Sequence, residues 1–284
     1  MSGAMTVAAV HRVAVTRRMQ RSNGWHGRVV SELWAFRELL YFFVWRDVKV
    51  RYKQTALGAG WAIIQPLMTM VVFTIFFGHL AKVPSDGMPY PVFSLMALVP
   101  WTYFSAALSG CSMSLSGYQH IISKVYFPRL VVPLAAVIAP LVDFAIAFVL
   151  LLGLMAWYRI VPTASILWLP ALMLLAVGTA TSVGIWLAAL SVRYRDVRYV
   201  VPFALQLWMF ATPVAYPASL VPPRWRTLYF LNPMAGVIEG FRWALAGGAA
   251  PGALTLVSAA VVAVLIIGGS VYFRRVEGTF ADVI

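Results

Sequence analysis

Long apolar segments constrain this chain more than any other feature of its sequence. Six segments approach or exceed the roughly twenty residues with which a helix crosses a bilayer. A transmembrane strand would alternate apolar and polar residues, whereas these segments are apolar throughout. We therefore predict an all-α integral membrane protein with six transmembrane helices, at residues 61–81, 92–115, 131–157, 166–190, 200–218 and 254–273.

The charged residues support this prediction and orient the chain. They make up only 11% of the sequence, against about 25% in a soluble domain. The net charge of +13 could suggest nucleic acid, but the basic residues lie at the borders of the apolar segments. Counting 17 of the 22 lysines and arginines on one side predicts that both termini are cytoplasmic, because cytoplasmic loops are enriched in these residues.

The chain before the first span divides into two parts. Residues 1–30 contain arginines without an apolar core, which predicts a basic cytoplasmic leader rather than a signal peptide. Residues 31–284 then form the transmembrane domain, beginning with an amphipathic interface helix over residues 31–56 that lies on the bilayer surface. A hinge at Gly58 and Gly60 leads into the first span.

Two later segments depart from simple spans. The third span is long and contains Pro133 and Pro140, so we expect a kink or tilt.

In the outer connection, Asn232-Pro233 is a helix start and Gly247-Gly248 a helix stop. The apolar residues between them are too few to cross a bilayer, which predicts a re-entrant outer helix. Glu239 and Arg242, three residues apart, are expected to form a local ion pair.

The sequence lacks the groups that most enzymes need. No glycine precedes any of the four lysines, so the chain has no P-loop for nucleotide phosphates. It also shows no His-x-x-x-His pair, cysteine cluster or paired carboxylates, so we predict no catalytic or metal site. The single cysteine, Cys111, lies in an apolar segment and is expected to be inert packing.

Asp143 is the only ionisable residue deep in a predicted span. Such a residue is a functional candidate by default. Counting from Val131 places it near the middle of the membrane, and no cation in another span lies at a matching depth. We therefore expect Asp143 to bond hydroxyls such as those of Ser112 or Thr181, rather than to form a proton relay.

Two further groups of residues have alternative interpretations. The basic cluster Arg46, Lys49, Arg51 and Lys53 could bind an anionic substrate headgroup or only anchor the helix to anionic lipid. Aromatic rings in the spans could stack against sugars or serve as ordinary packing and interfacial belt. Belt positions are expected for Trp61, Trp101 and Tyr103.

Several motifs, in order along the chain, resemble those of ABC-2-type permeases that export polysaccharides, the O-antigen, teichoic-acid and capsule exporter group. The resemblance covers about residues 32–275. The motifs are Arg51-Tyr52-Lys53 with Leu57-Gly58, Trp61 and Gln65-Pro66; Lys124-Val125-Tyr126-Phe127-Pro128-Arg129; Val192-Arg193-Tyr194-Arg195-Asp196; and Asn232-Pro233-Met234 with Glu239-Gly240-Phe241-Arg242.

This resemblance implies a homodimer that works with two copies of a separate P-loop ATPase, which would bind ATP and Mg²⁺; this chain itself needs no cofactor. It implies three groups of site residues. The ATPase-coupling residues would be Lys124, Val125, Tyr126, Phe127, Arg129, Arg193 and Arg195. The substrate entrance would hold Arg46, Lys49, Arg51, Tyr52 and Lys53. The aromatic translocation path would hold Phe73, Phe76, Phe77, Phe104, Trp208, Phe210 and Tyr216.

We therefore expect the permease subunit of an ATP-driven exporter of polyprenyl-pyrophosphate-linked polysaccharide in a bacterial inner membrane. The same fold could instead export a drug or small lipid. A proton-coupled carrier is disfavoured by the missing charge relay and inverted halves. A membrane enzyme acting on polyprenyl-phosphate sugars would need carboxylates or a metal that the sequence does not provide.

Overall fold

The computed structural model describes residues 31, 33–53, 58–122, 124, 127–248, 250 and 252–278, and these are helical with no strand. The predicted leader at residues 1–30 lies outside this part. The helices are α2 (Arg37–Lys53), α3 (Trp61–Phe73, continued by a π-helix over Thr74–Leu80), α4 (Tyr90–Gly117), α5 (Gln119–Ile122), α6 (Val131–Ile138), α7 (Leu141–Trp157), α8 (Leu169–Arg193), α9 (Val197–Phe210), α10 (Pro223–Tyr229), α11 (Pro233–Ala246) and α12 (Ala253–Glu277), with short 3₁₀ segments at Gly58–Gly60, Ala164–Trp168 and Ala218–Leu220.

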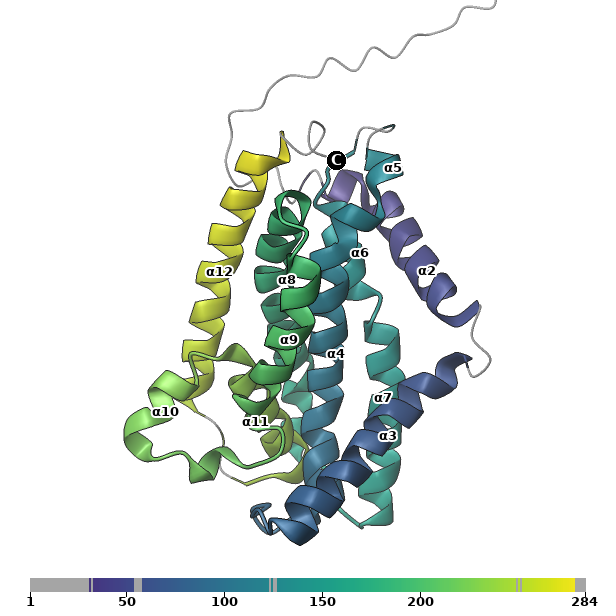
Figure 1. The fold of residues 1–284 in the computed structure, drawn as a ribbon. Helices are drawn as coiled ribbons and strands as arrows, with labels where there is room; N and C mark the ends of the chain where they lie inside the picture. The colour runs from purple at the N-terminus through teal and green to yellow at the C-terminus, as the bar shows by residue number, and fades with distance from the viewer. Residues whose placement is uncertain are drawn as a thin grey trace, which may run out of the picture.

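Helix α4 lies at the centre of the bundle, with α3, α6, α7, α8, α9 and α11 packed around it (Figure 1). Nearly every side chain in its first half is buried. Small residues allow this close packing: a methyl group on Gly184 of α8 would lie 2.5 Å from the sulfur of Cys111 on α4. Interfaces between membrane helices favour such small residues. Cys111 is fully buried, as expected for inert packing.

The two ends of the bundle differ. We call the end that holds α5 and the last turns of α8 and α12 the basic end, because Arg193, Arg274 and Arg275 lie there (Figure 1). The end of α3 and the helices α10 and α11 lie at the opposite end. The predicted cytoplasmic segments therefore gather at one end and the predicted outer segments at the other.

Five of the six predicted spans are confirmed as helices long and apolar enough to cross a membrane: Trp61–Leu80, Tyr90–Gly117, Val131–Trp157, Ala164–Arg193 and Ala253–Glu277. In place of the kink or tilt expected in the third span, the helix is interrupted: α6 ends at Ile138 and α7 begins at Leu141, on either side of Pro140. Proline lacks the N–H that would continue the helical ladder.

The predicted fifth span, residues 200–218, is wrong in its second half. Helix α9 has 14 residues and ends at Phe210. The composition of the sequence does not reveal this end, because the residues that follow Phe210 are mostly apolar as well. Their backbone oxygens are bonded by side chains from elsewhere instead of by a helical ladder, as when the Tyr90 hydroxyl donates to the carbonyl of Ala215 at 2.6 Å. Irregular backbone at membrane depth needs such partners.

The predicted interfacial belt is also corrected. Trp61 is 53% exposed, but Trp101 and Tyr103 are only 4% and 2% exposed. Both lie in the buried middle of α4, where the Trp101 ring packs against Phe104 and the Tyr103 hydroxyl donates to the carbonyl of Val137. The central position of α4 therefore puts these rings inside the bundle rather than at a lipid surface.

Candidate functional site

The end of α2 forms a polar cluster with the start of α7. The Arg51 guanidinium pairs with the Asp143 carboxylate, and the Tyr52 hydroxyl donates to the other oxygen of the same carboxylate. Asp143 lies in the first turn of α7, where the helix dipole favours a negative charge. Burial, and then the hydrogen bond to Asp143, raises the pKa of Tyr52. This tyrosine therefore stays protonated and serves as a donor.

The expectation that a hydroxyl bonds Asp143 is thus confirmed, but the named partners and the absence of a cation are wrong. The partners of Asp143 are Arg51 and Tyr52, while Ser112 and Thr181 bond to carbonyls of their own helices. Both Arg51 and Tyr52 lie in α2, which precedes the first span. Helix α2 packs along α6, and two side chains of its last turn, Arg51 and Tyr52, extend to Asp143 at the start of α7. A cation from outside the spans therefore reaches the carboxylate.

The middle of α2 contacts the segment that follows α4. The Arg46 guanidinium lies 3.9 Å from the centre of the Tyr118 ring, and the Tyr118 hydroxyl donates to Asp47 at 2.5 Å. Phe43 of α2 packs against both Tyr118 and Phe127. Burial, and then the bond to Asp47, raises the pKa of Tyr118. Helix α2 is therefore attached firmly to this segment by rings and by charge.

These contacts divide the predicted entrance residues. Arg46, Arg51 and Tyr52 are engaged with other parts of the same chain. Lys49 and Lys53 are exposed, and in the described part of the chain no ion pair involves them. Among the predicted entrance residues, the two lysines are thus the basic groups available to an outside anion.

The predicted coupling residues lie at the basic end. Val125 and Tyr126 fall outside the described residues. Lys124 is exposed, whereas Phe127 is buried against Phe43.

The other coupling residues contact neighbouring elements of the chain. Arg129 connects to the last turn of α12: its backbone N–H donates to the Glu277 carboxylate at 3.2 Å and its guanidinium to the Glu277 carbonyl. Arg193 lies against the Tyr194 ring, and Arg195 lines a small cavity beside it.

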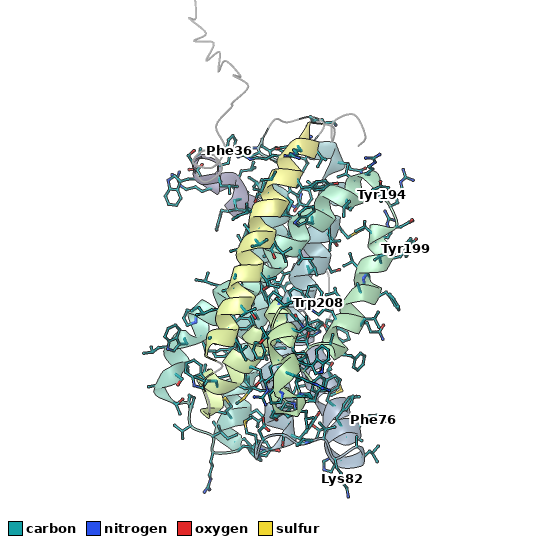
Figure 2. The ribbon with its side chains drawn as sticks, turned by 90° about the vertical axis from the view of Figure 1, so that its left-hand side faces the viewer. Phe36, Phe76, Lys82, Tyr194, Tyr199 and Trp208 are labelled. Carbon is teal, nitrogen blue, oxygen red and sulfur yellow. The ribbon has the colours of Figure 1, made fainter. Side chains whose placement is uncertain are left out.

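The predicted path residues fall into two groups. Phe73 and Phe104 are buried inside the bundle, and the Phe104 ring packs with its centre 5.0 Å from that of Trp208, which is labelled about midway along the bundle in Figure 2. Phe76 and Phe210 are 57% and 51% exposed. Phe77, Trp208 and Tyr216 are partly buried. The exposed rings belong to α3, including its π-helical extension, and to α9.

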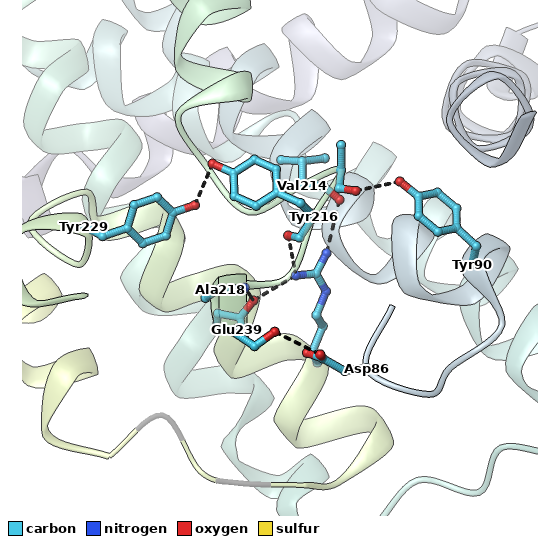
Figure 3. A network of polar contacts seen from close by, with 10 residues as sticks. Asp86, Tyr90, Val214, Tyr216, Ala218, Tyr229 and Glu239 are labelled. Carbon is cyan, nitrogen blue, oxygen red and sulfur yellow. Dashed lines mark hydrogen bonds and ion pairs between the residues drawn. The ribbon is translucent and has the colours of Figure 1, made fainter. Parts of the chain in front are cut away.

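The opposite end holds a second polar cluster, around Arg242 of α11 (Figure 3). The predicted ion pair is confirmed, with 2.8 Å between a guanidinium nitrogen of Arg242 and a carboxylate oxygen of Glu239. The Arg242 guanidinium, 5% exposed, also donates to the carbonyl of Val214 at 3.1 Å. It lies 3.6 Å from the centre of the Phe93 ring. One buried cation thus holds the irregular segment after α9 against α11 and α4.

The start of α11 supports the same segment. The Asn232 side chain accepts from the N–H of Met234, as the predicted helix start requires. Its amide nitrogen also donates to Thr212 at 2.8 Å, and its oxygen accepts from Trp208 at 2.9 Å. Positive φ angles at Gly247 and Gly248 confirm the predicted stop. The Asn-Pro pair indicates the cap locally, whereas the contacts of Asn232 with Thr212 and Trp208 join residues 20 and 24 positions apart.

The sequence profile described as "ABC-2 type transporter" matches residues 38–246. The chain is 31% identical to the O-antigen export system permease protein RfbA of Myxococcus xanthus, over 90% of this chain and 98% of that protein. It is 23% identical to the polysialic acid transport protein KpsM of Escherichia coli, over 72% and 79%. It is 26% identical to the inner membrane transport permease YadH of Escherichia coli, over 65% and 75%.

Proposed function

Since the chain belongs to the ABC-2 type transporter family, we propose that it is the permease subunit of an exporter that moves a lipid-linked polysaccharide, such as O-antigen, across a bacterial inner membrane. The observation that carries this proposal is the 31% identity to an O-antigen export permease over 98% of that protein's length. Because the chain has no P-loop, a separate ATPase would bind ATP and Mg²⁺.

The proposed topology has six crossings and both termini in the cytoplasm. The five long helices supply five crossings. The fifth in chain order would be made by α9 and the irregular segment behind it, with α11 as a re-entrant helix fixed by Asn232 and Arg242. The basic end would face the cytoplasm, in agreement with the distribution of lysine and arginine. Helix α2 would occupy the inner interface, where its exposed Trp45 and basic residues suit lipid headgroups.

The proposed path lies between two copies of the chain. Helices α3 and α9 both carry large exposed apolar side chains, including Phe76 and Phe210. These two rings would border the glycan, since sugars stack on aromatic faces. The buried Phe73 and Phe104 would support the wall from behind. At the entrance, Lys49 and Lys53 would attract the pyrophosphate of the lipid carrier, because they have no partner within the described chain.

The ATPase would contact the permease at residues 124–129 and would displace this segment when its own conformation changes. Phe127 packs on α2, and Arg129 bonds to the end of α12. The far end of α2 is joined to α7 through Arg51 and Asp143. A displacement of the segment at 124–129 would therefore act on α2, α7 and α12 together. The permease would be a two-state element whose equilibrium nucleotide biases through its partner.

The chain reconstituted with its ATPase in liposomes should translocate a polyprenyl-pyrophosphate-linked glycan only when both proteins and ATP are present. The readout is protection of labelled glycan from an external glycosidase. Transport driven by a proton gradient without the ATPase would contradict the proposal and favour a carrier. Transport of short lipids or drugs but not of glycans would favour the other exporter class.

Changing Lys124 to glutamate should reduce permease-stimulated ATP turnover. The side chain is exposed within the proposed docking segment, so reversal of its charge would weaken the contact with the ATPase. Loss of about 1.4 kcal/mol of interface free energy would lower the affinity about tenfold. Lys82→Glu is the matched control, because Lys82 is exposed at the opposite end. Equal effects of the two changes would argue against docking at this segment.

A further inference from the structure

A cavity of about 130 Å³ opens at the basic end, between the last turns of α4 and α8 and the start of α9. Its polar lining consists of Ser116, Gln119, Ser191, Arg195 and Arg198. Several water molecules would fit in this volume, so a single phosphate group can enter it and a sugar chain cannot. The cavity is separate from the Arg51–Asp143 cluster, which α2 and α7 form.

The lining of this cavity suits an anion. Two guanidinium groups reach it, and no carboxylate belongs to its wall. In the described part of the chain neither Arg195 nor Arg198 forms an ion pair. The Ser191 hydroxyl donates to the carbonyl of Ala188, which leaves Ser116 and Gln119 as additional donors. Guanidinium and hydroxyl donors together are typical of phosphate recognition.

The carboxyl-terminal ends of α4 and α8 explain why some basic residues lie here, but they do not explain why two arginines line a cavity. Helix carboxyl ends carry partial negative charge, and basic residues near them gain about 0.3–1 kcal/mol. Arg193, at the end of α8, meets that role while lying against Tyr194. Arg195 and Arg198 lie beyond the helix end and face a polar hollow instead. Their placement fits a bound anion better than a capping role.

The surface below the cavity indicates what kind of anion enters. Arg198 belongs to the first turn of α9, and this helix exposes an apolar stripe of Val200, Phe203 and Leu207 at 57%, 63% and 56%. Tyr199 projects outward beside the stripe in Figure 2. A lipid can place its phosphate among the arginines and its chain along this stripe. A soluble phosphate or an acidic side chain would leave the stripe unused.

We propose that this cavity, formed by Ser116, Gln119, Arg195 and Arg198, binds the phosphate of an anionic lipid whose hydrocarbon chain lies along α9. Basic pockets between membrane helices on the cytoplasmic side bind such headgroups in other proteins. The lipid is either an ordinary anionic phospholipid or a polyprenyl phosphate. Binding does not require transport, so the proposal stands independently of the exported substrate.

The test measures lipid binding to the purified full-length protein by native mass spectrometry, with phosphatidylglycerol and phosphatidylcholine of identical chains. Wild-type protein should prefer phosphatidylglycerol. The double variant Arg195→Gln/Arg198→Gln should raise the dissociation constant for phosphatidylglycerol about 30-fold, because each basic contact is lost. The control Arg193→Gln/Arg275→Gln removes two exposed arginines of the same end from outside the cavity and should change this constant less than about threefold.

Each other result has a defined meaning. Equal losses in the two double variants would show general attraction to the basic end and would overturn the proposal. Binding of inorganic phosphate as tight as that of phosphatidylglycerol would also overturn the proposal, because the hydrocarbon chain of the lipid would then contribute nothing to the affinity. Binding of undecaprenyl phosphate but not of phosphatidylglycerol would support it and identify the source of the phosphate. Unchanged lipid binding with lost ATPase association would assign the arginines to a protein partner. If the double variant does not fold, Arg198→Gln alone replaces it, with Arg193→Gln as its control.

Discussion

Replacing Asp143 by asparagine should lower glycan export about tenfold or more while leaving the protein folded. The change removes the charge that pairs with Arg51 and weakens the acceptor of Tyr52. Both side chains of the ion pair are partly exposed, at 40% and 25%, so the loss of stability should stay near 1 kcal/mol. Export should fall by more than this small loss of stability suggests, because Arg51 and Tyr52 lie in the last turn of α2, which leads into α3, a helix of the proposed path. A shift of 1.4 kcal/mol in the active state is enough for a tenfold loss.

A charge exchange tests the contact itself. The double variant Arg51→Asp/Asp143→Arg should recover part of the export that either single change removes, since the pair is restored with opposite polarity. Asp196→Asn is the matched control, because Asp196 is an exposed acid at the basic end. Export is measured in the reconstituted system with the ATPase. Normal export by Asp143→Asn, or no recovery in the exchanged variant, would show that this contact does not hold α2 in its working position.

Replacing Arg242 by methionine should destabilise the protein by about 3–5 kcal/mol, because it leaves the carboxylate of Glu239 without its buried partner. The change also removes the donor to the carbonyl of Val214 and the cation packed on Phe93. Hydrogen exchange of residues 211–218 should rise together with a fall in the thermal midpoint in detergent. Arg224→Met, which removes an exposed arginine of α10, should stay within about 0.5 kcal/mol of wild type.

The buried pair can also be removed as a unit. Glu239→Gln together with Arg242→Met should be more stable than Arg242→Met alone, since no uncompensated charge remains. The recovery should be incomplete, because the carbonyl of Val214 still lacks its donor. If Arg242→Met melts like wild type and leaves exchange at residues 211–218 unchanged, other contacts hold this segment.

The sequence predicts the parts of this fold that depend on local rules. Five spans follow from apolar length. The break at Pro140 and the start of α11 at Asn232 follow from backbone chemistry. The ion pair between Glu239 and Arg242 follows from their spacing on one helix face.

The errors arise where distant segments meet. Arg51 and Asp143 are 92 residues apart, and their contact depends on the packing of α2 along α6, which no local pattern encodes. The sequence does not reveal the end of α9 at Phe210, because apolar composition continues beyond it. The donors that bond the backbone carbonyls of the following segment come from Tyr90, Asn232 and Arg242. The arginine-lined cavity likewise joins α4, α8 and α9, which only the folded chain brings together.

The enclosure of α4 has a consequence for how this protein can move. A helix packed on every side cannot slide without opening voids in its surroundings, and interiors tolerate such voids poorly. Helix α3 keeps most of its surface outside the core. We therefore expect α4 to keep its position in any conformational change that accompanies export, and the movement to lie in peripheral helices such as α3.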